Sequence, residues 1–222
     1  MDARYERNFP ALSEAEFAAL RTKRVLVVGC GGLGGYLIEF MTRIGIGTLR
    51  ICDGDVFEAS NLNRQLLSQV PLVGTGKARA AAERAAAVNP EVHMEVCESF
   101  MTPETVVELV QACDAVLDGL DNIESRKLLA SACSEAGIPY IYGAVSGWVA
   151  QAAVAMPGDG LLDRLYPENA KLKSKSVLSF TPALCAAMQT ALCVKLLTGR
   201  PVESGTMSYF DLLNLEFEII PV

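Results

Sequence analysis

Apolar and polar residues follow one another along this chain in blocks that predict strands alternating with helices. The β-branched run 25–28 predicts a strand, and residues 33–44 carry apolar side chains at helical spacing. A glycine-rich turn joins the two, and a second apolar run, 49–52, ends at Asp53. Strand, glycine turn, helix, strand and acid, in this order, are typical of a dinucleotide-binding unit.

The alternation continues to the end of the chain. Strands that alternate with helices predict an α/β fold, a Rossmann-like, mainly parallel sheet with helices on both faces. The last two strands turn near 213–214 and are expected to be antiparallel at one edge. Further strands are predicted at 92–96, 115–118, 138–145, 148–155 and twice within 207–222, and further helices at 13–20, 74–88, 103–112, 123–136 and 182–197.

The chain is predicted to form a single domain, 1–222. Residues 1–23 read as an N-terminal arm, in which Ser13 and Glu16 have the spacing of a helix-capping box. Residues 56–73 lack a sustained period, and their Ser, Asn and Arg content predicts an ordered functional loop.

Another irregular segment, 157–181, is rich in Pro and Gly and predicts a mobile crossover. Its alternating lysines favour a solvated face, and steering of an acidic partner is the other interpretation. Before it, two glycines are expected to flank a bend between neighbouring strands. These residues are Lys171, Lys173, Lys175, Gly143 and Gly147.

Composition narrows the class of protein. The chain has 222 residues, of which 51% are hydrophobic and 20% charged, enough for one large core. Its formal net charge is −7, and no Lys/Arg block tracks a phosphate backbone, so a nucleic-acid partner is not favoured. Modification of RNA through a local basic patch remains open.

The seven cysteines are odd in number and spread through apolar runs, which indicates reduced, mostly buried thiols and a cytoplasmic protein. No C-x-x-C pair occurs, so a zinc site of that kind is not expected. The N-terminus has no apolar signal core, and no apolar run reaches membrane-spanning length. We therefore expect a soluble protein that is not exported.

The glycine turn is the first candidate site. Its glycines allow a tight turn and let phosphate oxygens approach the helix N-terminus, where the helix dipole favours negative charge. The motif alone fits NAD(P), FAD or another nucleotide. The alternative without a ligand is a glycine turn that serves only the packing of the helix on the strand. The turn holds Gly29, Gly31, Gly32 and Gly34.

Charged residues are expected to converge on this turn, because ligands of open α/β sheets bind beyond the carboxyl ends of the strands. Asp53 and Asp55 follow one strand, Arg64 lies on the loop, Lys77 opens a helix and Asp121 ends a strand. Hydride transfer does not require such cations. Phosphate chemistry requires positive charge on the phosphates and a carboxylate for Mg²⁺.

The motifs GCGGLG, DGDVFEASNLNRQ, GKA and DGLDN, in this order, resemble those of the ThiF/MoeB/HesA family, bacterial relatives of the ubiquitin-activating enzymes. The resemblance runs from RYERN in the arm to VKLLTGRP near the end. It implies a single adenylation domain that uses ATP and Mg²⁺. The expected substrate is the C-terminal Gly-Gly carboxylate of a small ubiquitin-fold sulfur carrier, which becomes an acyl-adenylate as pyrophosphate leaves.

The resemblance also assigns roles to residues. Gly31 and Gly32 would meet the nucleotide, Asp53 would hold the ribose, and Asp121 would serve the Mg²⁺ bound to ATP. The catalytic set is Arg7, Arg64, Lys77 and Asp121, with Arg7 lent by the second subunit of a homodimer. The other nucleotide-binding residues implied are Gly29, Gly34, Asp55, Ser60, Asn61, Gln65 and Asn122.

Departures from the family pattern limit the expectation. Both of the C-x-x-C zinc pairs of many members are missing, and the crossover segment has no cysteine to accept an acyl group. Adenylation alone is therefore expected. Alternatives are a small-molecule, peptide or tRNA-nucleoside substrate, a silent binder of a ubiquitin-like protein, and a nicotinamide oxidoreductase, which Lys77 and the SNLNRQ loop disfavour.

Other notable residues have plainer interpretations. Cys30, Cys185 and Cys193 are expected to be packing residues. The alternatives are an oxidation-sensitive Cys30 and Cys185 as an acyl acceptor. Asp118 either shares the metal with Asp121 or caps its strand. The remaining expectations are His93 on the surface, Arg126 on a helix surface or at a partner's tail, and Trp148 in the core.

Overall fold

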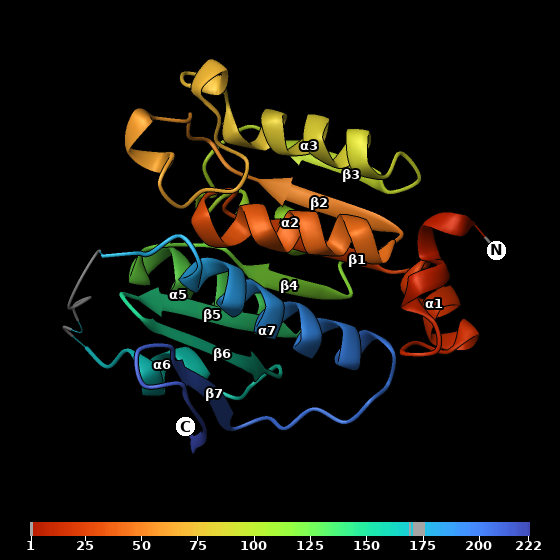
Figure 1. Ribbon diagram of the computed structural model, residues 1–222. Helices are drawn as coiled ribbons and strands as arrows, with labels where there is room; N and C mark the ends of the chain where they lie inside the picture. Colours follow the sequence, from red (N-terminus) through yellow and green to blue (C-terminus); the bar gives the residue numbers. More distant parts are fainter. Residues whose placement is uncertain (1, 169, 171–175) are drawn as a thin grey trace.

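The computed structural model describes residues 2–168, 170 and 176–222. These residues form one eight-stranded sheet in the order β3-β2-β1-β4-β5-β6-β7-β8 (Figure 1). The strands from β3 to β5 are parallel, and β6, β7 and β8 are antiparallel to their neighbours. The predicted fold class is confirmed. The strands are β1 Arg24–Val28, β2 Thr48–Cys52, β3 His93–Cys97, β4 Ala115–Asp118, β5 Tyr140–Ser146, β6 Val149–Ala155, β7 Thr206–Asp211 and β8 Glu216–Pro221.

Helices cover both faces of the sheet. Helices α2, α3 and α7 pack on one face, where α2 and α7 lie side by side, and α4, α5 and α6 pack on the other (Figure 1). The α-helices are α1 Glu14–Leu20, α2 Gly32–Ile44, α3 Lys77–Val88, α4 Val106–Val110, α5 Ile123–Glu135, α6 Leu161–Leu165 and α7 Thr181–Leu197, and the 3₁₀ helices are η1 Ala3–Asn8, η2 Ala59–Asn61 and η3 Val70–Leu72.

Strand β1 is buried on both faces of the sheet, and this explains the continuous apolar run in its sequence. Successive side chains of a strand point to opposite faces of the sheet. Val25 and Val27 therefore join the core under α2, while Leu26 and Val28 join the core under α5. Each such side chain, fully buried, contributes about 1.5–3 kcal/mol. The glycine turn that follows β1 is thus held between two packed layers.

The N-terminal arm is anchored at the amino ends of the strands. The buried Tyr5 hydroxyl accepts a hydrogen bond from Asn89 Nδ2 at 2.8 Å, and the Tyr5 ring lies against Gly45. Ser13 and Glu16 form the predicted capping box at the start of α1. Arg200, beyond α7, donates from Nη2 to Glu16 Oε2 at 2.9 Å and ties α1 to the domain.

Some local predictions were wrong. Helix α3 begins at Lys77 instead of 74–75, because Gly74 and Thr75 are tied by backbone hydrogen bonds to Phe57. Helix α4 is shorter than 103–112, because the Thr105 hydroxyl closes the preceding turn by accepting from the Thr102 N–H.

Two further differences lie around β5 and β6. Gly143 lies inside β5 and makes no bend; the turn is at Gly147, whose φ is 56°. The expected mobile segment 157–181 contains α6, whose Leu161 and Leu162 are buried against the sheet. The lysine alternation predicted at 171–175 lies outside the described residues.

Strand β8 ends the sheet as an open edge. Its apolar side chains Phe217 and Ile219 are exposed, and they alternate with Glu216 and Glu218. Phe217 pairs across the ladder with Phe210 of β7, with ring centroids 5.9 Å apart. Among the described helices, none is long and apolar enough to cross a membrane.

Candidate functional site

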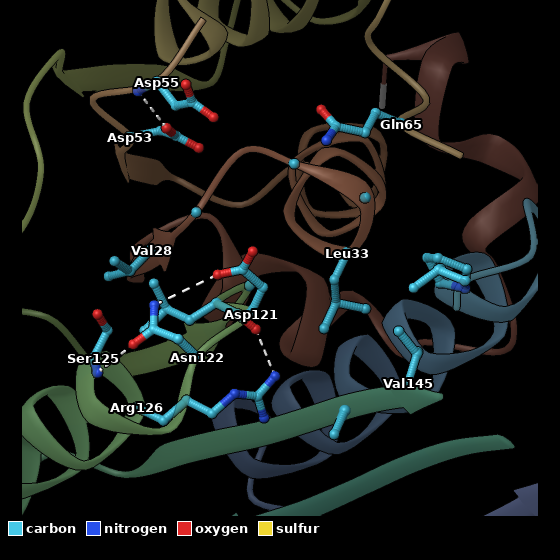
Figure 2. A pocket seen from close by; sticks show the side chains of 18 of the residues that line it. Val28, Leu33, Asp53, Asp55, Gln65, Asp121, Asn122, Ser125, Arg126 and Val145 are labelled. Atoms are coloured by element: carbon cyan, nitrogen blue, oxygen red, sulfur yellow. Dashed lines mark hydrogen bonds between the residues drawn. The ribbon is translucent and has the colours of Figure 1, made fainter. Parts of the chain in front are cut away.

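A pocket of about 630 Å³ opens at the carboxyl ends of the parallel strands, between β1 and β4 (Figure 2). At this point the strand order reverses, because the chain continues from β1 to β2 on one side and from β4 to β5 on the other. Such a position is the expected ligand site of an open α/β sheet. Most of the predicted nucleotide-binding residues line it: Gly29, Gly31, Gly32, Asp53, Asp55, Arg64, Gln65, Lys77, Asp121 and Asn122.

The glycine turn presents a helix N-terminus to this pocket. Gly31 is the N-cap of α2, and no side chain caps this end of the helix. The first N–H groups of a helix have no intrahelical partner, so they are available to an anion. Gly34 does not line the pocket: a Cβ there would lie 1.7 Å from the Gly29 carbonyl oxygen, so this glycine serves close packing of α2 on the turn.

Asp53, directly after β2, is held firmly in place. One carboxylate oxygen accepts from the Cys30 N–H at 2.6 Å and the other from the Asp55 N–H at 2.8 Å, as Figure 2 shows for the second bond. Carboxylate oxygens have further lone pairs, so the group is still able to accept hydrogen bonds from a ligand.

Lys77 lies at the first position of α3, and only 8% of its side chain is exposed. Its ammonium group pairs with Asp55. This hydrogen bond from Lys77 lowers the pKa of Asp55 below its ordinary value. The pocket thus contains a largely desolvated cation, and the acidic side chain that pairs with it among the described residues, Asp55, is itself half-exposed.

The loop after β2 holds Arg64 at the pocket wall. Arg64 Nη1 donates to the Ser60 carbonyl at 3.0 Å and to Asn63 Oδ1 at 2.9 Å. Gln65 is buried beside Gly31, and its Oε1 has no hydrogen-bond partner among the described residues. A buried polar atom of this kind indicates a missing partner at this wall of the pocket.

Two predicted residues of the same loop do not line the pocket. The buried Asn61 accepts from the Glu58 N–H through Oδ1 at 3.0 Å, and it thereby closes the η2 turn. The Ser60 hydroxyl donates to Glu58 Oε2 at 3.2 Å. In this structure both side chains shape the loop that carries Arg64.

The turn after β4 rests on a buried ion pair. Asp118 is 0% exposed; it accepts from the Tyr140 hydroxyl at 2.6 Å and lies 3.2 Å from Arg126 Nη1. It also accepts from the Leu120 N–H at 2.8 Å, so it caps the end of the strand. Burial raises the pKa of Asp118, and the Arg126 charge opposes this.

The prediction that Arg126 lies on a helix surface was wrong. Arg126 is 5% exposed, donates to the Leu120 carbonyl at 2.5 Å and lies over the Tyr142 ring. Figure 2 shows its side chain at the pocket, beside the turn that carries Asp121 and Asn122. A signal was present in the sequence, because Arg126 shares a helical face with the apolar Leu129 and Cys133. The ion pair supports the turn that ends in Asp121.

Asp121 and Asn122 form the rim of the pocket next to this turn. Asn122 caps α5, accepting from the Ser125 N–H at 2.8 Å, and its Nδ2 lies 3.5 Å from Asp121 Oδ1. Asp121 is exposed to the pocket. Within the described part of the chain, no group of three or more His, Cys, Asp or Glu side chains is placed to hold a metal ion.

Arg7 lies far from this pocket in its own chain. It is exposed on η1, which packs at the amino ends of the strands beside Asn89, whereas the pocket is at the carboxyl ends (Figure 1). Within the described ranges, no acidic side chain pairs with it.

The plainer expectations have mixed outcomes. Cys30, Cys185 and Cys193 are fully buried, which confirms their packing role and leaves Cys185 without access to an acyl group. His93 is exposed on the edge strand β3. Trp148 is 43% exposed and not in the core, because it follows the Gly147 turn at the end of the hairpin, where its ring lies 5.3 Å from that of Phe180.

Sequence reasoning missed some of the pocket wall. Phe100, Met101 and Tyr166 also line the pocket. The first two follow β3, so the rule that ligands bind beyond strand ends was sufficient to find them. Tyr166 reaches the pocket only through the packing of α6, which the sequence did not reveal.

The family model described as the ThiF family matches residues 5–222. The chain belongs to the ThiF family. Over 210 residues it is 34% identical to the SAMP-activating enzyme E1 of Haloferax volcanii, covering 91% of this chain and 77% of the relative. It is 31% identical over 230 residues to the sulfur carrier protein ThiS adenylyltransferase of Bacillus subtilis, covering 97% and 67%.

The fold of this ThiF-family chain matches solved structures. Escherichia coli MccB, in a complex with MccA-N7isoASN, has a TM-score of 0.86 at 19% identity, covering 100% of this chain and 72% of that one. Several curated relatives are longer, since the chain spans 60%, 54% and 49% of their lengths.

Proposed function

We propose that this chain is an ATP-dependent adenylyltransferase. It activates the C-terminal Gly-Gly carboxylate of a ubiquitin-fold sulfur carrier to an acyl-adenylate and releases pyrophosphate. One observation carries the proposal: Lys77, Arg64 and Asp121 lie around one helix N-terminus in a single pocket. Two relatives of this ThiF-family chain are named as a ThiS adenylyltransferase and a SAMP-activating enzyme, which supports the choice of substrate.

The pocket offers a separate group to each part of ATP. The oriented Asp53 carboxylate suits the ribose hydroxyls, and the glycine turn suits a phosphate group. Lys77 and Arg64 suit the β- and γ-phosphates. Asn61 and Ser60 act indirectly in this proposal, because they shape the loop that holds Arg64.

The reaction requires no general base. A C-terminal carboxylate is ionised at pH 7, so the protein has to place it in line with the α-phosphorus and stabilise the charge that develops on pyrophosphate. Lys77 is almost fully buried, and a cation acts more strongly at low dielectric. Hydride transfer by a nicotinamide enzyme does not require a buried cation at this position.

Mg²⁺ fits the donor set of the pocket. In proteins Mg²⁺ is commonly bound by one or two carboxylates together with substrate phosphates. Asp121 supplies a carboxylate at the rim, and the Asp118–Arg126 pair fixes the turn that precedes it. The ion would neutralise phosphate charge, and Asp121 would hold it against ATP.

A homodimer completes the proposed site. Arg7 is exposed at the edge remote from its own pocket, so only a second copy is able to bring it to the phosphates. Helix α7 supports this arrangement, because its outer residues Leu184, Met188 and Leu192 are only partly buried. A helix that is apolar all round is normally covered.

ATP–pyrophosphate exchange is the direct test of the proposed function. With radiolabelled pyrophosphate and Mg²⁺, exchange should require a ubiquitin-fold carrier with an intact Gly-Gly end. The matched control is the same carrier with one extra C-terminal alanine. No exchange with any carrier of this class, or equal exchange with the extended control, would refute the proposal.

The seven free thiols suit the cytoplasmic location that we also propose.

A further inference from the structure

Two cysteines end neighbouring strands at the edge of the pocket. Cys52 is the last residue of β2, Cys97 is the last residue of β3, and the two are partners in the parallel ladder. Neighbouring strands lie about 4.7–4.9 Å apart. Disulfides join cysteines whose Cα atoms are about 4.4–6.8 Å apart, so the Cα spacing of neighbouring strands falls within this range.

The two thiols point to the same side of the sheet. Both cysteines belong to the core face that α4 and α5 cover. Cys52 Sγ donates to the Ser99 carbonyl at 3.2 Å, and Cys97 Sγ lies 3.2 Å from the Ser99 hydroxyl. Both sulfur atoms are therefore in contact with one residue.

The two cysteines differ in solvent exposure, and this difference determines which thiol reacts first. Cys97 is half-buried on an edge strand, whereas Cys52 is 1% exposed and lines the pocket. Burial, with the Cys97 thiol beside it, raises the pKa of Cys52. An oxidant from solvent therefore meets Cys97 first, because the thiolate is the reactive form and access limits the reaction.

We infer that Cys52 and Cys97 are an oxidation site that forms a reversible disulfide and thereby weakens nucleotide binding. The oxidant is a hydroperoxide such as H₂O₂. The Cys97 thiolate attacks one peroxide oxygen, the O–O bond breaks, and Cys97 becomes a sulfenic acid as hydroxide leaves. The Cys52 sulfur then attacks the sulfenic sulfur, the S–S bond forms, and the Cys52 proton leaves with the hydroxyl as water.

The disulfide acts on the part of the pocket that carries Asp53. The Asp53 N–H donates to the Cys97 carbonyl at 3.1 Å, so the backbone of Asp53, which directly follows β2, is also attached to the end of β3. Next to it, Gly54 is tightly packed: a Cβ there would lie 2.4 Å from the Phe100 nitrogen. Drawing the strand ends together displaces Asp53 and Phe100, since this junction has no free space.

The same geometry makes the bond easy to reduce. Cβ atoms in a disulfide are typically about 3.8 Å apart, and neighbouring parallel strands hold them farther apart than this. The strand ends must therefore close by several tenths of an ångström, and a strained disulfide is more reducible. Reversible rather than structural oxidation is what a reducing compartment permits.

The test treats the full chain with H₂O₂ and follows two readouts that do not depend on the enzymatic reaction. Mass spectrometry of a non-reduced digest should show a peptide containing Cys52 joined to one containing Cys97. Affinity for the non-hydrolysable ATP analogue AMPCPP, measured by calorimetry, should fall about tenfold or more, which is about 1.4 kcal/mol. Dithiothreitol should restore it, and AMPCPP added first should slow cross-linking.

Variants separate the site from general oxidation damage. Cys97→Ser should bind AMPCPP normally and keep its affinity after peroxide, because the first sulfur is gone. The matched control is Cys113→Ser at the amino end of β4, which should respond like the parent chain. Absence of the cross-linked peptide, unchanged affinity in the cross-linked protein, or equal loss in Cys97→Ser would each overturn the inference. Since cross-linking and analogue binding require no carrier protein, failure here is distinguishable from failure of the proposed adenylation.

Discussion

Lys77 contributes its charge from a position that is almost closed to water. Replacing it with alanine leaves the rest of α3 in place but removes the buried cation to which we assign stabilisation of the developing pyrophosphate. We expect Lys77→Ala to lower the rate of ATP–pyrophosphate exchange by about 10²–10³-fold, as removal of one preorganised charge-stabilising group does elsewhere. Arg79→Ala, an exposed position of the same helix, is the control; similar activity of the two variants would mean that the site is misassigned.

Two glycines of the same turn should respond differently to alanine. Gly34→Ala should cost about 3 kcal/mol of unfolding free energy, because its Cβ would overlap the Gly29 carbonyl and backbone is unable to rotate away. Gly32→Ala should keep its stability, since its Cβ meets only ordinary contacts, the nearest being Arg64 Cγ at 3.7 Å. The second variant should instead lose nucleotide affinity. Urea unfolding and calorimetry distinguish the two, and equal stability would contradict the packing role.

The sequence was sufficient for those site residues whose position follows from a strand end. Asp53 could be predicted because it directly follows a buried apolar run, Asp121 because it lies on the turn after one, and Lys77 because it lies at the start of a helix. Asp118 and Arg126 could not be resolved in the same way. Asp118 contacts Tyr140 and Arg126 lies over Tyr142, both on strand β5, and no local sequence pattern reports such contacts.

At the scale of elements, helix α1 is held by a charge that responds to pH. The hydrogen bond from Arg200, and then those from Ser13, lower the pKa of Glu16 from 4.5 to about 2. A carboxylate with a depressed pKa in the folded state stabilises the fold above its unfolded pKa, and this contribution is lost as the pH falls through the folded value. The stabilisation by Glu16 should therefore be complete above pH 4.5 and disappear toward pH 2.

The measurement compares melting temperatures of the parent chain and Glu16→Gln across this range. The difference between them should be largest near neutral pH, at about pH 7, and vanish in strong acid. Glu14→Gln, an exposed change in the first turn of the same helix, is the control. A difference that persists unchanged down to pH 2 would show that the charge of Glu16 is not what holds α1.

The junction between α7 and the sheet depends on one glycine. Gln189 Nε2 donates to the Asp118 carbonyl at 2.9 Å and to the Ile141 carbonyl at 3.0 Å, and a Cβ at Gly143 would lie 2.2 Å from its side chain. Gly143→Ala should therefore destabilise the protein by about 1–3 kcal/mol in urea, because the amide is displaced from both acceptors. Ala144→Ser, on the next residue, is the control, and unaltered stability of Gly143→Ala would contradict this account.

Elements were predictable where their signals are local. The Ser13–Glu16 capping box and the alternation of β6 lie within a few residues, and both are confirmed. Gly143 was interpreted as flanking a bend, because a glycine between apolar runs usually marks one. A glycine is needed at this position because the side chain of Gln189, on a distant helix, occupies the space of a Cβ, and only the tertiary structure reveals that contact.

At the scale of the whole molecule, shared sites make a distinctive prediction. If Arg7 serves the pocket of the second subunit, Arg7→Ala and Lys77→Ala should each be inactive alone and regain activity when mixed. After subunit exchange, random pairing of equal amounts leaves about a quarter of the sites intact. Exchange activity near that fraction is expected, and persistent inactivity of the mixture, with mixed dimers demonstrated by mass spectrometry, would contradict the shared site.

The open edge of β8 has a consequence for behaviour at high concentration. An unpaired strand with exposed apolar side chains is a template for pairing with another chain, and such pairing leads to aggregation. Glu216 and Glu218 alternate with Phe217 and Ile219 on this strand. Two copies that met edge to edge would bring these carboxylates together, and like charges that face one another are destabilising. Repulsion between these carboxylates therefore opposes fibril-like stacking at the β8 edge, while the exposed Phe217 side chain stays accessible.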